Sequence, residues 1–203
     1  MSAMSSVKAF LTSVPAGEPF SSNSLRQLAT TENIRQILNR LVKSGELSRV
    51  ARGVFVKPKS VANLGKVLPS ATEIAKTLTE STGETIAIHG AEAARQLQLS
   101  TQVPLRLIFY TSGNSRTLRI ANRTIKLKHV NPSQLIAPGT MPGLVISALA
   151  YLGKKNVTRH TLELIEKRIS AKDFKATVQL MKSMPAWMSD IFFRYLQSSR
   201  EKK

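Results

Sequence analysis

Apolar residues between positions 34 and 42 recur at the spacing of one helix face. Five of them follow the i, i+3, i+4, i+7, i+8 pattern of an amphipathic helix: Ile34, Ile37, Leu38, Leu41 and Val42. Polar and basic side chains then fall on the opposite face. Thr31 is a suitable N-cap, and Gly45 stands where a left-handed residue often ends a helix. The pattern predicts a helix over residues 32–44.

A hairpin is predicted directly after this helix. Residues 47–57 contain two short apolar runs, and Arg52-Gly53 is a suitable turn between them. Upstream, the pattern predicts two shorter helices, one over residues 4–12 and one that points Leu25 and Leu28 inward. Helix, helix, turn, helix and hairpin, in this order, are typical of a winged helix-turn-helix.

The rest of the chain predicts a second domain. Residues 60–69 combine a glycine and a proline with little periodicity, and we interpret them as a linker. The domains predicted on either side are a winged helix-turn-helix at 1–59 and a mixed α/β domain at 70–203. The second domain is expected to hold a small mixed sheet with helices, followed by a helical C-terminal part. The predicted fold class of the whole chain is α+β.

Charge points to a polyanionic partner. Thirty lysines and arginines stand against twelve aspartates and glutamates, which gives a formal net charge of +18. The excess is spread over the whole chain and is not confined to a tail. On a folded chain such an excess favours nucleic acid, through phosphate contacts and counterion release. A basic, solvated surface with no such partner is the alternative interpretation.

The predicted helix and hairpin carry side chains suited to double-stranded DNA. Asn and Gln can pair with adenine and Arg with guanine in the major groove, whereas Lys more often contacts phosphate. The candidates on the helix are Thr31, Asn33, Arg35, Gln36, Asn39, Arg40 and Lys43, of which Lys43 is expected at phosphate. The candidates on the hairpin are Arg49 and Arg52, expected at the DNA backbone or minor groove, and Lys57, expected at the flanking phosphates.

A second basic face is predicted on a later hairpin, over residues 117–129. Its apolar residues alternate with basic ones, so one face is expected in the core and the other in solvent. The basic candidates are Arg119, Arg123, Lys126 and Lys128. They would add phosphate contacts or help neighbouring copies to bind.

The sequence offers little for catalysis. It contains no phosphate-binding glycine loop, no His-Glu-x-x-His motif and no serine elbow. With no cysteine and three scattered histidines, a metal site is not expected. His89, before Gly90 at a predicted strand-to-helix junction, is the one place where a catalytic role could begin; a local hydrogen bond is the ordinary alternative. We expect no enzyme activity, no cofactor and no metal.

The expected location is the cytoplasm. No apolar run approaches the ~18 residues that a membrane span requires. The N-terminal segment is too lightly charged, and its apolar part too short, for a convincing signal peptide. A soluble protein with no membrane partner is therefore expected.

Three stretches of the chain resemble AbiEi-type antitoxins. They are LNRLVKSGELSRVARGVFVKP, IAIHGAEAARQLQLSTQVPLRLIFYTSGNSRTLRI and ALAYLGKKNVTRHTLELI. The resemblance covers nearly the whole chain and includes a glycine-glutamate-leucine step and an arginine-glycine-valine-aromatic wing. It implies a DNA-binding antitoxin that represses its own operon and counteracts a partner toxin. In that family the toxin is a nucleotidyltransferase-like protein encoded beside the antitoxin.

Two hypotheses follow from the sequence. The first is a sequence-specific DNA-binding antitoxin and autorepressor, a monomer or a cooperative binder, that reads its operator with the helix 32–44 and contacts the backbone with the wing 47–57. The second is a protein-interaction module whose basic surface binds an acidic partner protein, with incidental DNA binding. The first hypothesis predicts that substitutions in the helix and wing abolish function. The second predicts that substitutions in the C-terminal helices do so, while substitutions in the wing have no effect.

Overall fold

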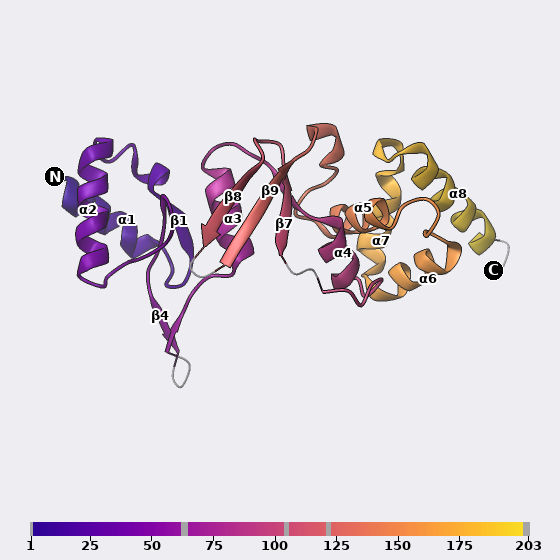
Figure 1. Cartoon of the computed structure of the whole chain (residues 1–203), viewed down its shortest axis with the longest axis horizontal. Coiled ribbons are helices and arrows are strands. Elements are labelled where there is room, and N and C mark those ends of the chain that lie inside the picture. The colour runs from indigo at the N-terminus through magenta and orange to yellow at the C-terminus, as the bar shows by residue number, and fades with distance from the viewer. Residues whose placement is uncertain (1, 62–64, 104–105, 121–122, 201–203) are drawn as a thin grey trace. The chain divides into compact units, whose positions relative to one another are not determined.

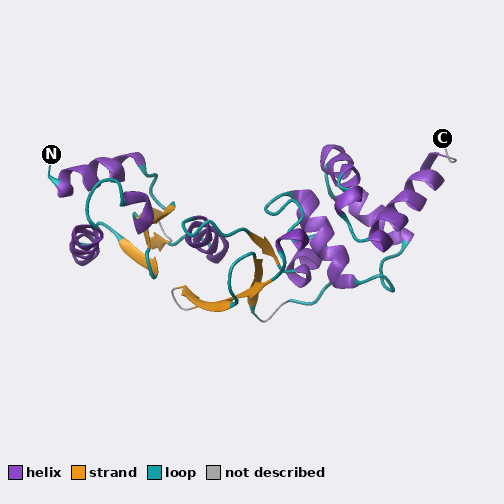
Figure 2. Cartoon of the chain, turned by 90° about the horizontal axis from the view of Figure 1, so that it is seen from above, coloured by secondary structure: helices purple, strands orange, loops and turns teal. Residues whose placement is uncertain are grey.

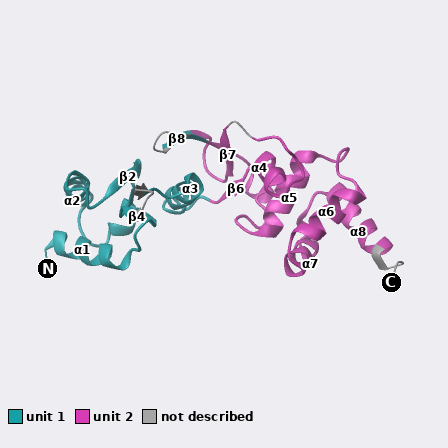
Figure 3. Ribbon diagram, turned by 90° about the horizontal axis from the view of Figure 1, so that it is seen from below, with its two compact units in different colours: residues 1–84, 117–125 teal, residues 85–116, 126–203 magenta. Residues whose placement is uncertain are grey.

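The computed structural model describes residues 2–61, 65–103, 106–120 and 123–200 of the 203-residue chain (Figure 1). It contains both helices and small sheets, which confirms the predicted α+β class. The chain divides into two compact units, residues 1–84 with 117–125 and residues 85–116 with 126–203 (Figure 3). None of the helices in the described part is long and apolar enough to cross a membrane.

The first unit contains helices, one three-stranded sheet and a separate two-stranded ladder. Its elements up to residue 80 are α1 (Ala3–Ser13), β1 (Pro19–Ser21), the 3-10 helix η1 (Ser22–Leu25), α2 (Thr31–Lys43), β2 (Ser48–Ala51), β3 (Val54–Val56), β4 (Lys59–Val61), β5 (Gly65–Val67) and α3 (Ala71–Glu80). The three-stranded sheet has the order β1-β3-β2, and both of its strand pairs are antiparallel. β4 pairs with β5, also antiparallel.

One face of the three-stranded sheet packs against α1 and α2. The shared core holds residues from both helices, from η1, from β1 and β3, and from the segment just before β2: Val7, Leu11, Phe20, Leu25, Ile34, Ile37, Leu38, Leu41, Leu47 and Phe55. The apolar residues of the predicted helix are thus buried, apart from the half-buried Val42. Gly45 adopts the predicted left-handed conformation at φ +78°, and α2 ends just before it. The N-cap of α2 is Thr30, whose side chain accepts from the Asn33 amide, so the predicted cap at Thr31 was one residue late.

The opposite face of this sheet is also covered. Val54 and Val56 are fully buried, and side chains alternate along a strand, so they point away from the side on which Phe55 packs. α3 contacts both β1 and β3. The Asn23 side-chain amide also donates to the Ser81 carbonyl, just after α3, at 3.0 Å. For this reason α3 belongs to the first unit.

Two predictions for the first unit differ from the structure. The segment 60–69, predicted as a linker, contributes to the β4–β5 ladder, and the division of the chain falls beyond α3. The predicted second helix is a single 3-10 turn, η1, closed by a bond of the i→i−3 type from Arg26 N to Asn23 O. Because the helix does not continue, Leu28 is 37% exposed and does not point inward.

The second unit combines part of a sheet with a helical C-terminal region. Its elements are β6 (Ile86–Ile88), α4 (Gly90–Gln96), β7 (Leu107–Thr111), η2 (Pro132–Gln134), α5 (Met141–Leu152), α6 (Arg159–Arg168), α7 (Ala171–Gln179), η3 (Met181–Ser183) and α8 (Ala186–Arg200). The hairpin of β8 (Arg116–Ile120) and β9 (Arg123–His129) is divided in sequence, because residues 117–125 are assigned to the first unit and residues 126–129 to the second. The strand order is β6-β7-β9-β8. Figure 2 shows that the described elements after η2 are all helical.

The second unit is built around α4 and α5, which pack closely against each other. Gly90 makes this approach possible, because a Cβ there would lie 2.4 Å from the Tyr151 Cβ and 2.5 Å from the Ser147 carbonyl oxygen. α5 begins at a Thr140 cap and places Val145, Ala148 and Leu149 in the core with no exposure.

Candidate functional site

The exposed face of α2 presents the polar residues that the sequence predicted. Its inner face is anchored in the core of the first unit, so the remaining side chains point into solvent. The exposed candidates on this helix are Thr31, Asn33, Arg35, Gln36, Asn39, Arg40 and Lys43. Their amide and guanidinium groups are the types that pair with base edges, and the surface is therefore chemically suited to the DNA major groove.

One carboxylate organises the N-terminal half of this face. Glu32 accepts from Arg35 Nη2 at 2.8 Å and from Gln36 Nε2 at 3.3 Å. The hydrogen bond from Arg35 is the main reason that the pKa of Glu32 lies below its ordinary value. Glu32 is therefore charged at neutral pH and holds two of the candidate side chains through their donor groups.

The hairpin of β2 and β3 supports the same face. Arg49 on β2 donates from Nη2 to Asn39 Oδ1 at 2.7 Å, and its guanidinium lies over the Phe55 ring at 5.2 Å. Arg52 is exposed in the turn, where Gly53 takes a φ of +78°. The Gly53 carbonyl accepts from the Ser22 amide at 2.8 Å, and this bond ties the hairpin tip to the start of η1.

Four arginines surround a cavity of about 270 Å³ in this unit. Arg26 comes from the end of η1, Arg35 from α2, Arg49 from β2 and Arg52 from the hairpin turn. Ile34, Leu38 and Phe55 supply apolar lining, and none of the described lining residues is acidic. Guanidinium groups have a fork geometry that suits phosphate oxygens, and this concave surface brings four of them together, of which Arg35 is paired with Glu32 and Arg49 donates to Asn39.

Sequence reasoning did not identify Arg26. It lies outside the predicted recognition helix and hairpin, in the short second helix that was predicted from Leu25 and Leu28 and given no binding role. No local pattern marks it, because its place at the cavity depends on the Ser22–Gly53 bond between segments distant in sequence.

Lys57 has a different environment from the one predicted for it. Its ammonium donates to the carbonyl oxygens of Leu11 and Val14, both at 2.9 Å, at the C-terminal end of α1. The side chain is half-buried. A lysine at this point satisfies carbonyls that the helix leaves unpaired and is favoured by the helix dipole. In this structure Lys57 therefore stabilises α1 and does not extend the exposed basic surface.

The second predicted basic face is exposed where the structure describes it. On β9, Lys126 and Lys128 are exposed, while Ile125 and Leu127 are fully buried, as the alternation predicted. Arg119 on β8 is also exposed. The side chain of Arg123 lies outside the described residues.

The contacts of His89 are of a structural kind: it caps a helix and packs against a tyrosine ring. Its Nδ1 accepts from the Ala91 amide at 3.2 Å as the N-cap of α4, and its ring packs 4.8 Å from that of Tyr110. Burial, with a smaller contribution from the charge of Lys128, lowers the pKa of His89 below its ordinary value. Among the described residues, no group of three or more His, Asp or Glu side chains is arranged to hold a metal ion.

The comparison with protein families gives one match. The model of a family described as "Family of unknown function (DUF6088)" matches residues 7–177, which include α2, the β2–β3 hairpin and most of the second unit. No curated protein matches the chain significantly. Because the match covers well over half of the sequence, this chain belongs to the DUF6088 family of unknown function.

Proposed function

We propose that the first unit is a winged helix-turn-helix that binds double-stranded DNA. In this proposal α2 is the recognition helix in the major groove and the β2–β3 hairpin is the wing at the backbone. The order of α1, η1, α2 and the hairpin, with the core on the inner face of α2, fits such a module.

The observation that carries the proposal is the arginine-lined cavity beside the exposed face of α2. Arg26, Arg35, Arg49 and Arg52 come from four different segments and surround one concave surface. The adjoining α2 face offers amide side chains at Gln36 and Asn39. Cationic groups that position a phosphate next to groups that read base edges are the two components of specific DNA recognition.

The proposed biological role is that of an antitoxin and transcriptional autorepressor. The DNA would be the operator of the chain's own operon, and a nucleotidyltransferase-like toxin would be encoded beside it. This part rests on the resemblance of the wing segment and of the later stretches to AbiEi-type antitoxins. The net charge of +18 supports binding to nucleic acid, but it does not bear on the antitoxin role.

Two matched alanine variants test base reading against phosphate contact. Gln36→Ala removes an amide from the N-terminal half of α2, and Lys43→Ala removes a charge from its last turn. Binding of each variant is measured on the chain's own upstream DNA and on a scrambled duplex of equal length. Gln36→Ala is expected to weaken operator binding by about tenfold and to leave scrambled binding unchanged. Lys43→Ala is expected to weaken both duplexes alike and to reduce the salt dependence.

Identical behaviour of the two variants on both duplexes would refute the assignment of α2 as the reading helix. If neither variant changed binding, the basic surface would instead fit the alternative, a module for an acidic partner protein. A thermal melt of each variant provides the control, because both side chains are exposed and their loss should leave the fold intact.

A further inference from the structure

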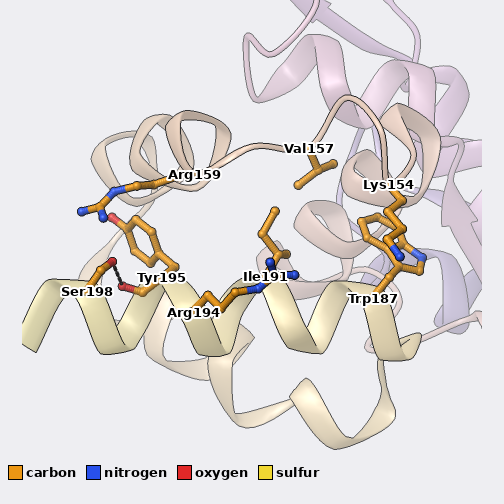
Figure 4. Close-up of a pocket in the computed structure, with 8 residues that line it drawn as sticks. All are labelled: Lys154, Val157, Arg159, Trp187, Ile191, Arg194, Tyr195 and Ser198. Atoms are coloured by element: carbon orange, nitrogen blue, oxygen red, sulfur yellow. Dashed lines mark hydrogen bonds between the residues drawn. The ribbon is translucent and has the colours of Figure 1, made fainter.

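The second unit carries a groove of its own, remote in sequence from the residues of the proposed DNA-binding surface (Figure 4). It has a volume of about 510 Å³ and lies between one stripe of α8 and the segment that joins α5 to α6. Its lining from α8 is Trp187, Ile191, Arg194, Tyr195 and Ser198, and its lining from the other side is Lys154, Val157 and Arg159. The α8 stripe spans roughly 16 Å along the helix axis. All five residues of this stripe lie after residue 177, where the family match ends.

The charges at this groove are basic and partly uncompensated. Arg159 is paired with Glu163, with its Nε 3.0 Å from Oε1. Lys154 and Arg194 are exposed, and within the described part of the chain neither makes an ion pair. Burial, followed by the hydrogen bond to Glu166, raises the pKa of Tyr195 to about 12, so its hydroxyl carries no charge at neutral pH. No acidic residue is among the described lining residues.

The two aromatic rings of the groove differ in exposure, and Trp187, which packs against the core of this unit, is the partly exposed one. Tyr195 is only 6% exposed, and the Arg159 guanidinium covers its ring at 5.9 Å. Trp187 is half-buried at the opposite end of the stripe, where Figure 4 draws it together with Lys154. Ile191 and Val157 provide an apolar middle section between the two ends.

We propose that this groove binds an unpaired stretch of a nucleic-acid strand. A base stacks on Trp187, while Lys154 and Arg194 contact the phosphates next to it. Cations along a groove together with an aromatic ring that a base can reach are the two elements that single-strand binding uses, because every base has a face that can stack; here the ring is the partly exposed Trp187. The overall charge of +18 favours a polyanion over a neutral ligand. An acidic polypeptide could pair with Lys154 and Arg194, but it carries no nucleobase to stack on the indole ring of Trp187.

The chain's own fluorescence tests the proposal, because Trp187 is its only tryptophan. The full-length protein is titrated with single-stranded oligothymidylate and oligouridylate of about twelve nucleotides. Saturable quenching of the Trp187 emission is expected, and it should weaken as salt rises. The two oligonucleotides distinguish DNA from RNA as the source of the strand. Polyglutamate and a blunt duplex of the same length serve as competing ligands.

Matched variants assign the binding to the groove. With a labelled oligonucleotide, Arg194→Ala and Trp187→Ala are each expected to weaken binding at least ~fivefold, whereas Trp187→Phe, which keeps a stacking ring, stays near the wild type. Lys175→Ala removes an exposed charge from α7, outside the groove, and should have little effect. Thermal melts identify any variant that fails to fold. If Arg194→Ala does not fold, Arg194→Lys replaces it, and the expected loss of oligonucleotide binding is smaller.

Three results would overturn the proposal. Oligonucleotide binding without any change in Trp187 emission would place the strand elsewhere on the chain. Equal losses in Lys175→Ala and Arg194→Ala would reduce the binding to general charge attraction. Quenching by polyglutamate but not by oligonucleotides would make the groove a docking site for an acidic polypeptide.

Discussion

Glu32 is the only acidic residue of α2, and its position on the exposed face is unexpected for a surface that meets phosphates. It holds Arg35 and Gln36, and the hydrogen bond from Arg35 lowers its pKa. A carboxylate placed in this way repels DNA of any sequence and competes with bases for two reading side chains. Glu32 is therefore expected to increase discrimination at the cost of affinity.

The variant Glu32→Gln tests this role. Removal of the charge should raise affinity for a scrambled duplex severalfold, because the repulsion acts on all DNA. It should also narrow the preference for the operator, because Arg35 and Gln36 would no longer be held by a carboxylate that only a correct base can replace. Fluorescence anisotropy on both duplexes at one fixed salt concentration measures the two effects. If operator binding alone were lost, Glu32 would instead be a direct reader of cytosine.

Lys57 shows how a residue predicted at phosphate can be engaged within the fold instead. It stands in a basic hairpin, yet its ammonium is used by the Leu11 and Val14 carbonyls. Lys57→Met should cost about 1–3 kcal/mol of the unfolding free energy, because two carbonyls lose a charged donor. A denaturant titration measures the loss. DNA binding below the unfolding transition should stay near the wild type, and a large drop in affinity for the still-folded variant would restore the predicted phosphate contact.

At the scale of elements, the parts with a strong local pattern could be predicted from sequence. The helix 32–44 follows from its apolar spacing and from Gly45, and the capping box of Ser70 and Glu73 marks the start of α3. β1 was not predicted, because Pro19 and the preceding Gly17 look like a turn. β1 forms a strand since it pairs with β3, a contact between positions far apart in the chain.

The junction of β6 and α4 is predicted to make the second unit sensitive to acid. The folded state lowers the pKa of His89, first through burial, and the ring must stay neutral to accept from the Ala91 amide. The unfolded chain then binds the proton more readily, so this contribution to stability is complete above about pH 6.5 and is lost as the pH falls toward the lower folded pKa.

Thermal melts of the wild type and of His89→Asn between about pH 7.5 and 5 measure this effect. Asn keeps an oxygen that can accept from the Ala91 amide and has no titrating group. The variant is expected to lose less stability on acidification than the wild type. Parallel losses in the two proteins would show that other groups cause the acid sensitivity.

At the scale of the whole molecule, the division of the chain was the hardest feature to predict. Residues 60–69 look like a linker by composition, but the three consecutive buried residues of β3 require cover on both faces of the sheet. α3 contributes that cover, with Ile74 and Ala75 buried, and the segment 117–125 joins the same unit from much later in the chain. Local composition carries no information about such long-range packing.

A pair of N-terminal fragments tests this division. The fragment 1–59 ends before α3, whereas the fragment 1–84 includes it. The shorter fragment should expose Val54 and Val56 and lose its cooperative thermal transition or melt well below the longer one. Circular dichroism of both fragments measures the difference. Equal melting temperatures would show that α3 adds nothing to the first unit and would support a boundary near residue 60.

The most direct test of the proposed function is duplex binding across a salt series. The full-length protein is titrated with its own upstream DNA and with a scrambled duplex of equal length, from low salt to ~200 mM, where contacts to phosphate alone weaken strongly. A first unit that reads bases predicts that both affinities fall with salt while a preference for the upstream DNA persists at ~150–200 mM. Equal affinities that disappear together at these salt concentrations would contradict sequence-specific binding and leave a basic protein whose specific partner is not its operator.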